Sequence, residues 1–328
     1  MKKKKKIVVI GGGTGSFVVL SGLRKYPVSL TAIVSVTDSG GSTGRLRTEF
    51  GFLPVGDMRQ CLAALKAENG DDYIRKILLY RFSKGKGLKG HNLGNLILTA
   101  LTDLTNSEPR AVEIAARIFR LEGKIFPVTT SNIQLKATYE DGKTIIGEHE
   151  IDEPKHQGGK KIIKLSTKPK AKIYLKAKKA IQEADLIILG PGDLYTSILP
   201  NLVIEGTKKA IQNSKAKIIY IVNLMTRYGQ TPNFTAQDHI KEIEKHLGRK
   251  LNLVLLNTGK IPDKVLNLYK QEKGFPVKDD LKNNNNFKLI RKDFLAPAIK
   301  MKSKGDVLQR SYLRHSPDKL AKAITSLL

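Results

Sequence analysis

Two glycine-rich turns within the first fifty residues constrain the fold of this chain more than any other feature. The apolar run KIVVI at 6–10 leads into GGGTG at 11–15, and SLTAIVSV at 29–36 leads into TDSGGSTGRLR at 37–47. Each run has the length of a buried strand, and glycine permits a tight turn into a following helix. A strand, a glycine turn and a helix, repeated in this order, predict parallel βαβ units.

The same alternation returns in the second half of the chain. Helical patterns at 176–184, about 199–213 and 235–247 precede apolar runs with strand character at 185–190, 217–224 and 251–259. Strands that alternate with helices of this length are typical of a doubly wound sheet. We therefore predict a Rossmann-like α/β fold with a mostly parallel sheet.

The middle of the chain has a different pattern. Residues 125–175 alternate between apolar and polar side chains and contain Asp141-Gly142, a dipeptide typical of hairpin turns. We interpret this region as an antiparallel, β-rich insertion. With no internal repeat and no long linker, we expect one α/β domain over residues 1–328 that carries the insertion.

Composition narrows the classes of function. Cys61 is the only cysteine, which excludes an intrachain disulfide and fits a reducing, cytoplasmic compartment. No apolar run reaches the roughly 18 residues of a transmembrane helix. The formal net charge is +28, but the lysines are spread over the whole chain. We attribute the charge to composition and expect no DNA or RNA partner, since nucleic-acid-binding motifs are absent from the sequence. The sequence leaves open whether the protein forms a homo-oligomer.

The first turn is a candidate phosphate site. A glycine turn between a strand and a helix presents free backbone N–H groups and the positive end of the helix dipole to an anion. The alternative is an ordinary tight turn without a ligand. The candidate residues are Gly12, Gly13, Thr14 and Gly15.

The second turn carries more polar chemistry. Successive N–H groups among its glycines are expected to form an anion-binding nest, and Arg45 offers a bidentate donor to a phosphate. Asp38 stands where α/β nucleotide sites often direct an acid toward a ribose or a base. A flexible loop with solvated arginines is the alternative. The candidates are Thr37, Asp38, Ser39, Gly40, Gly41 and Arg45.

Two further motifs add polar candidates. Asp57 in PVGDMRQC is most simply an N-cap of the following helix, and the alternatives are a contact to a substrate hydroxyl or to a metal. Asn92 and Asn95 in HNLGN lie three residues apart on the first turn of a predicted helix. Two amides can read a base edge or a sugar, although Asn92 could instead cap the helix.

A third glycine turn follows the predicted strand at 185–190. The segment GPGDLYTSILPN exposes backbone N–H groups and adds hydroxyls and one acid, and the segment at 223–231 is a weaker candidate for the same cleft. A plain turn is the alternative. The candidates are Gly190, Pro191, Gly192, Asp193, Tyr195, Thr196 and Ser197. The sequence contains neither a nucleophile elbow nor a cluster of metal ligands, so we assign no catalytic residue and predict no metal site.

Seven motifs, in order along the chain, resemble those of the gluconeogenesis factors, the bacterial branch of the CofD superfamily of phospholactate transferases. The motifs are GGGTG, VTDSGGSTGRLR, PVGDMRQCLAAL, HNLGNLIL, GPGDLYTSILPNLVI, NLMT with FTAQDHI, and LRHSPDKLA. The resemblance implies a cytoplasmic regulatory protein that binds a UDP-sugar, typically UDP-N-acetylglucosamine, and affects cell shape and growth on gluconeogenic carbon sources.

The transferase branch implies a second interpretation, a magnesium-dependent transfer of phospholactate from a nucleotide-activated substrate. Members of that branch carry an acidic pair where this chain has Asp38-Ser39, and RYGQT stands here in place of a typical QPGET. These departures remove acidic groups that a metal would use. The sequence therefore favours ligand binding without turnover and leaves magnesium only to the transferase interpretation.

Overall fold

The computed structural model describes residues 4–66, 73–153, 159–282, 286–297 and 311–328. Seven parallel strands form the central sheet, in the order β10-β9-β8-β7-β1-β2-β3. Their bounds are β1 Lys5–Gly11, β2 Val28–Val34, β3 Lys124–Pro127, β7 Leu186–Leu189, β8 Lys217–Ile221, β9 Leu253–Asn257 and β10 Lys288–Lys292. The predicted Rossmann-like, doubly wound α/β fold is confirmed.

The direction of the chain across the sheet reverses between β1 and β7. From β1 the chain moves outward through β2 to β3, and it returns to pair β7 with the other edge of β1 before it continues to β10. Such a reversal leaves a crevice outside the carboxyl ends of the two central strands, where open α/β sheets bind ligands. The first and third glycine turns follow these two strands.

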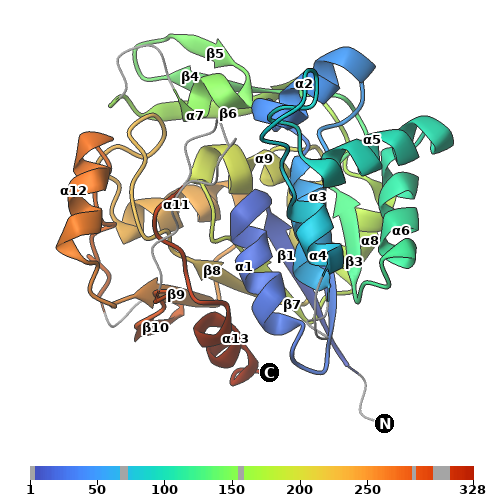
Figure 1. Ribbon diagram of the computed structural model, residues 1–328. Coiled ribbons are helices and arrows are strands. Elements are labelled where there is room, and N and C mark those ends of the chain that lie inside the picture. The colour runs from blue at the N-terminus through green and yellow to red at the C-terminus, as the bar shows by residue number, and fades with distance from the viewer. Residues whose placement is uncertain (1–3, 67–72, 154–158, 283–285, 298–310) are drawn as a thin grey trace.

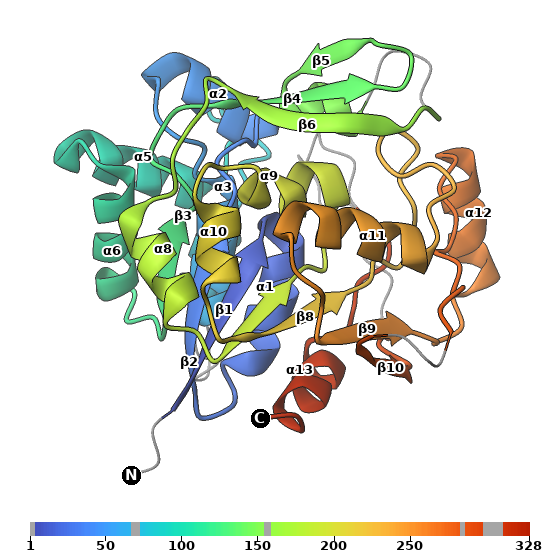
Figure 2. The same cartoon turned by 180° about the vertical axis from the view of Figure 1, so that it is seen from behind.

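Both faces of the sheet are covered by helices (Figures 1 and 2). Ile7 and Val9 of β1 face one core, whereas Val8 and Ile10 face the other, and all four are at most 2% exposed. One face carries α1 Gly13–Leu23, α3 Gly56–Leu65 and α13 Pro317–Thr325. The opposite face carries α8 Leu175–Gln182, α9 Leu199–Leu202, α10 Thr207–Gln212 and α11 Ala236–Leu247. Burial on two faces explains the uninterrupted apolar runs.

The remaining helices lie around this core. Their bounds are α2 Gly41–Phe50, α4 Tyr73–Leu79, α5 Leu93–Thr105, α6 Glu108–Ile118, the single π-turn η1 Leu194–Ile198 and α12 Asp263–Gln271. The C-terminal helix α13 packs on α1 so closely that a Cβ added at Gly22 would lie 2.2 Å from the Pro317 carbonyl oxygen. No helix in the described part of the chain combines the length and the apolar character needed to span a bilayer.

The insertion forms a small antiparallel sheet of order β5-β4-β6. Its elements are β4 Gln134–Tyr139, β5 Thr144–Ile146, α7 Glu148–Asp152 and β6 Ile162–Lys168. Gly142, with φ of 82°, lies in the turn between β4 and β5, as the Asp-Gly signal predicts. Figure 1 shows this sheet above the helices and the parallel sheet, at the end of the molecule opposite the two termini.

Two predictions about the elements are wrong in detail, and two elements are not predicted. Residues 125–127, assigned to the insertion, belong to the parallel strand β3, because their side chains pack in the main core beside β2. The second glycine turn continues into the unpredicted helix α2, and β10 is a further unpredicted strand. The helix expected at 199–213 is interrupted, because Gly206 adopts a left-handed φ of 91° between α9 and α10.

Candidate functional site

The three glycine turns meet at the carboxyl edge of the parallel sheet, as their positions after the strands predict. A Cβ added at Gly15 would lie 1.6 Å from the carbonyl oxygen of Pro191, so the first turn packs directly on the third. A Cβ added at Gly56 would lie 2.8 Å from the Asp38 Oδ2 atom and 2.5 Å from the Thr43 Oγ1 atom. Glycine is required at both positions because a neighbouring polar group approaches the backbone this closely.

A cavity of about 240 Å³ opens between these turns. Most of the sequence-predicted candidates line it: Gly12, Gly13, Thr14, Gly15, Asp38, Gly40, Asp57, Asn95, Pro191, Gly192, Asp193, Thr196 and Ser197. The weaker candidate segment at 223–231 also reaches it, through Asn223, Leu224, Met225 and Arg227. The predicted common cleft therefore exists, and its walls come from β1, β2, β7 and β8 together.

The other candidates lie outside the cavity lining: Thr37, Ser39, Gly41, Arg45, Asn92, Gly190 and Tyr195. Asn92 caps α5, since its Oδ1 accepts a hydrogen bond from the Asn95 N–H at 3.2 Å. Arg45 is exposed on α2 and donates to the Lys89 carbonyl at 3.2 Å. The Tyr195 hydroxyl donates to the Ile162 carbonyl at 3.3 Å and so holds β6. These polar groups have structural partners within the protein.

Asp57 lines the cavity but does not cap a helix. Helix α3 begins at Gly56, and Val55 occupies the N-cap without a side-chain hydrogen bond. The Asp57 carboxylate instead lies over the first glycine turn, where its Oδ2 would be 2.4 Å from a Cβ at Gly12 and its Oδ1 2.9 Å from one at Gly13. Tertiary contact, and not capping, therefore fixes this carboxylate.

A buried arginine lies behind Asn95 in the cavity wall. Arg59, only 5% exposed, donates from Nε to the Asn95 Oδ1 at 2.8 Å and from Nη1 to the Leu78 carbonyl at 3.1 Å. Asn95 in turn donates to the Ser42 hydroxyl at 3.3 Å. Arg59 is not among the predicted site residues, although a charged side chain next to Met58 and one turn from Leu62 is itself a signal.

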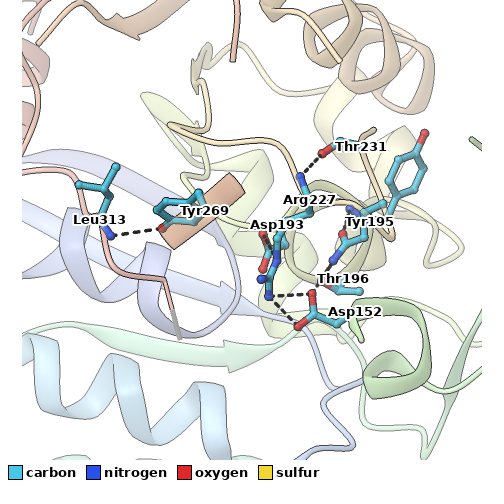
Figure 3. A network of polar contacts seen from close by, with 9 residues as sticks. Asp152, Asp193, Tyr195, Thr196, Arg227, Thr231, Tyr269 and Leu313 are labelled. Atoms are coloured by element: carbon cyan, nitrogen blue, oxygen red, sulfur yellow. Dashed lines mark hydrogen bonds and ion pairs between the residues drawn. The ribbon is translucent and has the colours of Figure 1, made fainter. Parts of the chain in front are cut away.

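The insertion covers the cavity with charged groups from α7, namely Glu148, His149, Asp152 and Glu153. Arg227 holds this cover in place (Figure 3). Its Nη2 donates to both carboxylate oxygens of Asp152, at 3.1 and 2.9 Å, and its Nε lies 3.6 Å from the Asp193 Oδ1. Burial lowers the pKa of Arg227, but Asp193 and Asp152 together outweigh burial and raise it. The arginine is therefore a fixed cation between two acids.

Gln230 extends this network to the third glycine turn. Its Nε2 donates to the Asp152 Oδ1 at 2.7 Å and to the Thr196 hydroxyl at 3.1 Å, and its Oε1 accepts from the Tyr195 N–H at 3.1 Å. The Gln230 amide, which lies in the segment after β8, therefore connects α7 to η1. RYGQT, which departs from the family pattern in sequence, supplies both Arg227 and Gln230.

Glu148 faces other carboxylates across the cavity. Its Oε2 accepts from the Ser39 N–H at 3.5 Å. Burial, followed by the charges of Asp38, Asp152 and Asp57, raises the pKa of Glu148 well above its usual value. A raised pKa favours the protonated acid, which can donate a hydrogen bond.

Charged side chains of both signs line the cavity. The acids are Asp38, Asp57, Glu148, Asp152, Glu153 and Asp193, and the bases are Arg59, Arg81, Arg227 and Arg314. In the described part of the chain, no three His, Cys, Asp or Glu side chains are arranged to hold a metal ion. Backbone N–H groups and arginines suit a diphosphate, and carboxylates and amides suit hydroxyl groups.

Residues near the C-terminus form the last wall of the cavity, namely Ser311, Leu313, Arg314 and His315. The Leu313 N–H donates to the Tyr269 hydroxyl at 3.3 Å, which joins this segment to α12 (Figure 3). The sequence predicts the helix that follows, with Ser316 as N-cap and Pro317 at its first position, and both are confirmed. It offers no indication that the residues before the cap return to the cavity.

Comparison with known proteins gives consistent matches over nearly the whole chain. The family model of the 2-phospho-L-lactate transferase CofD matches residues 7–295. The gluconeogenesis factor of Bacillus subtilis is 38% identical over 330 residues, covering 100% of this chain and 99% of the relative. That of Listeria innocua is 39% identical and covers 99% and 96%, respectively. A crystal structure of a UPF0052 family member from Bacillus halodurans has a TM-score of 0.88 at 37% identity, covering 99% of this chain and 100% of that one.

Proposed function

This chain belongs to the CofD family, in its gluconeogenesis factor branch, and from that premise we propose that it is a cytoplasmic regulatory protein that binds a UDP-sugar of the UDP-N-acetylglucosamine type. In this proposal the bound ligand reports the supply of cell-wall precursor and links it to cell shape during gluconeogenic growth. The observation that carries the proposal is the convergence of three glycine turns on one cavity at the switch point of the sheet.

The chemistry of the cavity supports this ligand class. Backbone N–H groups of Gly192 and of the first turn, with the guanidinium group of Arg314, are suited to a diphosphate. Asp38 and Asn95 offer an acid and an amide to the hydroxyl groups of a ribose or hexose. A nucleotide-sugar presents both kinds of group in one molecule.

A phospholactate-type transferase is the second candidate, favoured by the match to the CofD family model. Magnesium is usually held by one or two carboxylates together with the phosphates of the substrate. The acid at the position of Ser39 is therefore the group on which this candidate depends. Ser39, where the transferases carry an acid, binds the His149 N–H at 3.0 Å instead. We therefore favour binding without turnover.

Thermal unfolding with UDP-, GDP- and ADP-linked ligands tests the proposal. A ligand that binds only the folded protein adds about 2.7 kcal/mol at 100 times its Kd. We expect stabilisation confined to UDP-sugars. Asp38→Ala should abolish this stabilisation, because Asp38 lines the cavity, whereas the matched control Arg45→Ala should keep it, because Arg45 is exposed outside the lining.

Three results would count against the proposal in different ways. Absence of stabilisation by any nucleotide would reject both candidates. Equal stabilisation in the two variants and the wild type would show that Asp38 takes no part in binding. Transfer of phospholactate from a nucleotide-activated donor to a deazaflavin alcohol, with magnesium present, would favour the transferase.

A further inference from the structure

Two hydrogen-bond acceptors in one wall of the cavity have no partner in the protein. They are the His315 Nε2 and the Asn223 Oδ1. Both atoms are buried, and the His315 side chain as a whole is only 5% exposed. Leaving a buried polar atom without a hydrogen bond costs about 1 to 3 kcal/mol. Two such atoms on the lining of one cavity point to donors that a ligand supplies.

The chemistry of His315 fixes its Nε2 as an acceptor. The Val222 carbonyl accepts a hydrogen bond from the ring. Because Nε2 has no partner, that bond uses Nδ1, which therefore carries the proton. Burial lowers the pKa of His315 to about 4, so the ring is neutral at pH 7. A neutral imidazole protonated on Nδ1 presents a lone pair on Nε2.

The backbone holds His315 in this position. The N–H of the next residue, Ser316, donates to the Phe294 carbonyl at 2.7 Å, and His315 itself bridges to Leu295. Asn223 directly follows Val222, the partner of the His315 ring, at the exit of β8. The two acceptors therefore come from two segments that are in contact, one that follows β8 and one that precedes α13.

We propose that His315 and Asn223 form an acceptor subsite that binds the hydroxyl or N–H donors of the neutral part of the ligand. This inference rests on the proposed binding of a UDP-sugar. A diphosphate, which presents only acceptor oxygens when fully ionised, cannot satisfy this subsite. The subsite would thus hold one of the two neutral ends of the ligand, the nucleoside or the hexose, beside β8, with the diphosphate toward the glycine turns.

Calorimetric titration of His315→Phe with UDP-N-acetylglucosamine tests the subsite. Phenylalanine keeps a ring of similar size but has no acceptor, so we expect the Kd to rise about tenfold or more. The matched control is His239→Phe. His239 is also fully buried, its Nδ1 lies 2.9 Å from the Thr235 carbonyl oxygen, and its Nε2 is also unpartnered, but it lies outside the cavity lining. The Kd of the His239→Phe variant should equal that of the wild type.

Two further measurements identify the donor and guard against misfolding. Titration with UDP shows which part of the ligand supplies the donor. If the Kd of His315→Phe for UDP is unchanged, the hexose supplies it. If that Kd is raised, the nucleoside supplies it. Asn223→Leu, of similar size, should weaken binding in the same way if His315→Phe fails to fold. An unchanged Kd for UDP-N-acetylglucosamine in either folded variant would overturn the subsite alone, whereas a wild type that binds neither ligand would overturn the proposed function as well.

Discussion

The floor and the cover of the cavity are built on different physical principles. The floor consists of the first and third glycine turns, Gly12–Gly15 and Gly190–Gly192, which pack backbone against backbone. The cover consists of α7, held over the cavity by Arg227 and its two acids. Close packing fixes the floor regardless of pH or salt, whereas the cover depends on charge. The geometry of the floor should therefore persist across conditions, whereas the position of the cover should respond to changes in charge.

The largest effect should follow from a side chain in the floor. Gly15→Ala would place a Cβ 1.6 Å from the Pro191 carbonyl oxygen, and two backbone segments would have to separate. We expect the variant to lose more than about 4 kcal/mol of unfolding free energy or to fail to fold. The control Gly51→Ala, at φ of 72° with open space around it, should lose only about 1 kcal/mol in urea unfolding. Similar losses in both would show that the floor is not tightly packed.

A smaller effect should follow from removal of the cation in the cover. Arg227→Met leaves Asp152 and Asp193 near one another without their counter-ion, and we expect a loss of about 3 kcal/mol in urea unfolding. Lys245→Met, which breaks an exposed pair with Glu242, should cost less than about 1 kcal/mol. Adding Asp152→Asn to Arg227→Met should restore part of the loss. No restoration would mean that charge does not hold the cover.

The smallest effect concerns the acid that faces the other carboxylates. Because the pKa of Glu148 is raised in the folded protein, the folded state keeps a proton that the unfolded state releases above about pH 4.5. This acid therefore destabilises the wild type increasingly as the pH rises above 4.5. Glu148→Gln should raise Tm relative to the wild type at pH 7 and less at pH 4.5. A Tm difference that is the same at both pH values would contradict this electrostatic origin.

The same contrast explains how much the sequence predicts. The glycine turns are predictable because only glycine allows another group to approach the backbone this closely. Gly15 and Gly56 both meet such a neighbour. The strands are predictable because burial on both faces removes polar residues from them. The local patterns therefore identify the strands and the glycine turns that form one wall of the cavity.

The cover and the cavity wall near the C-terminus depend on contacts between segments that are distant in the sequence. Local sequence patterns do not indicate such contacts. Arg227 pairs with Asp152, 75 residues earlier in the chain. The sequence predicts a phosphate contact for Arg45 because a guanidinium offers two parallel donors, but its loop continues as α2 and the side chain donates to the Lys89 carbonyl. Asp57 has the residue type of an N-cap, yet its carboxylate is used by the first turn.

The distance in sequence between the two halves of the sheet affects how the protein is made. Strand β1 emerges from the ribosome early, but its partner β7 begins at Leu186 and the last cavity wall ends at His315. The backbone N–H and C=O groups on the edge of β1 that faces β7 must therefore stay unpaired with other strands until β7 has been synthesised. A ligand that needs every wall of the cavity can therefore assist folding only after His315 has been synthesised.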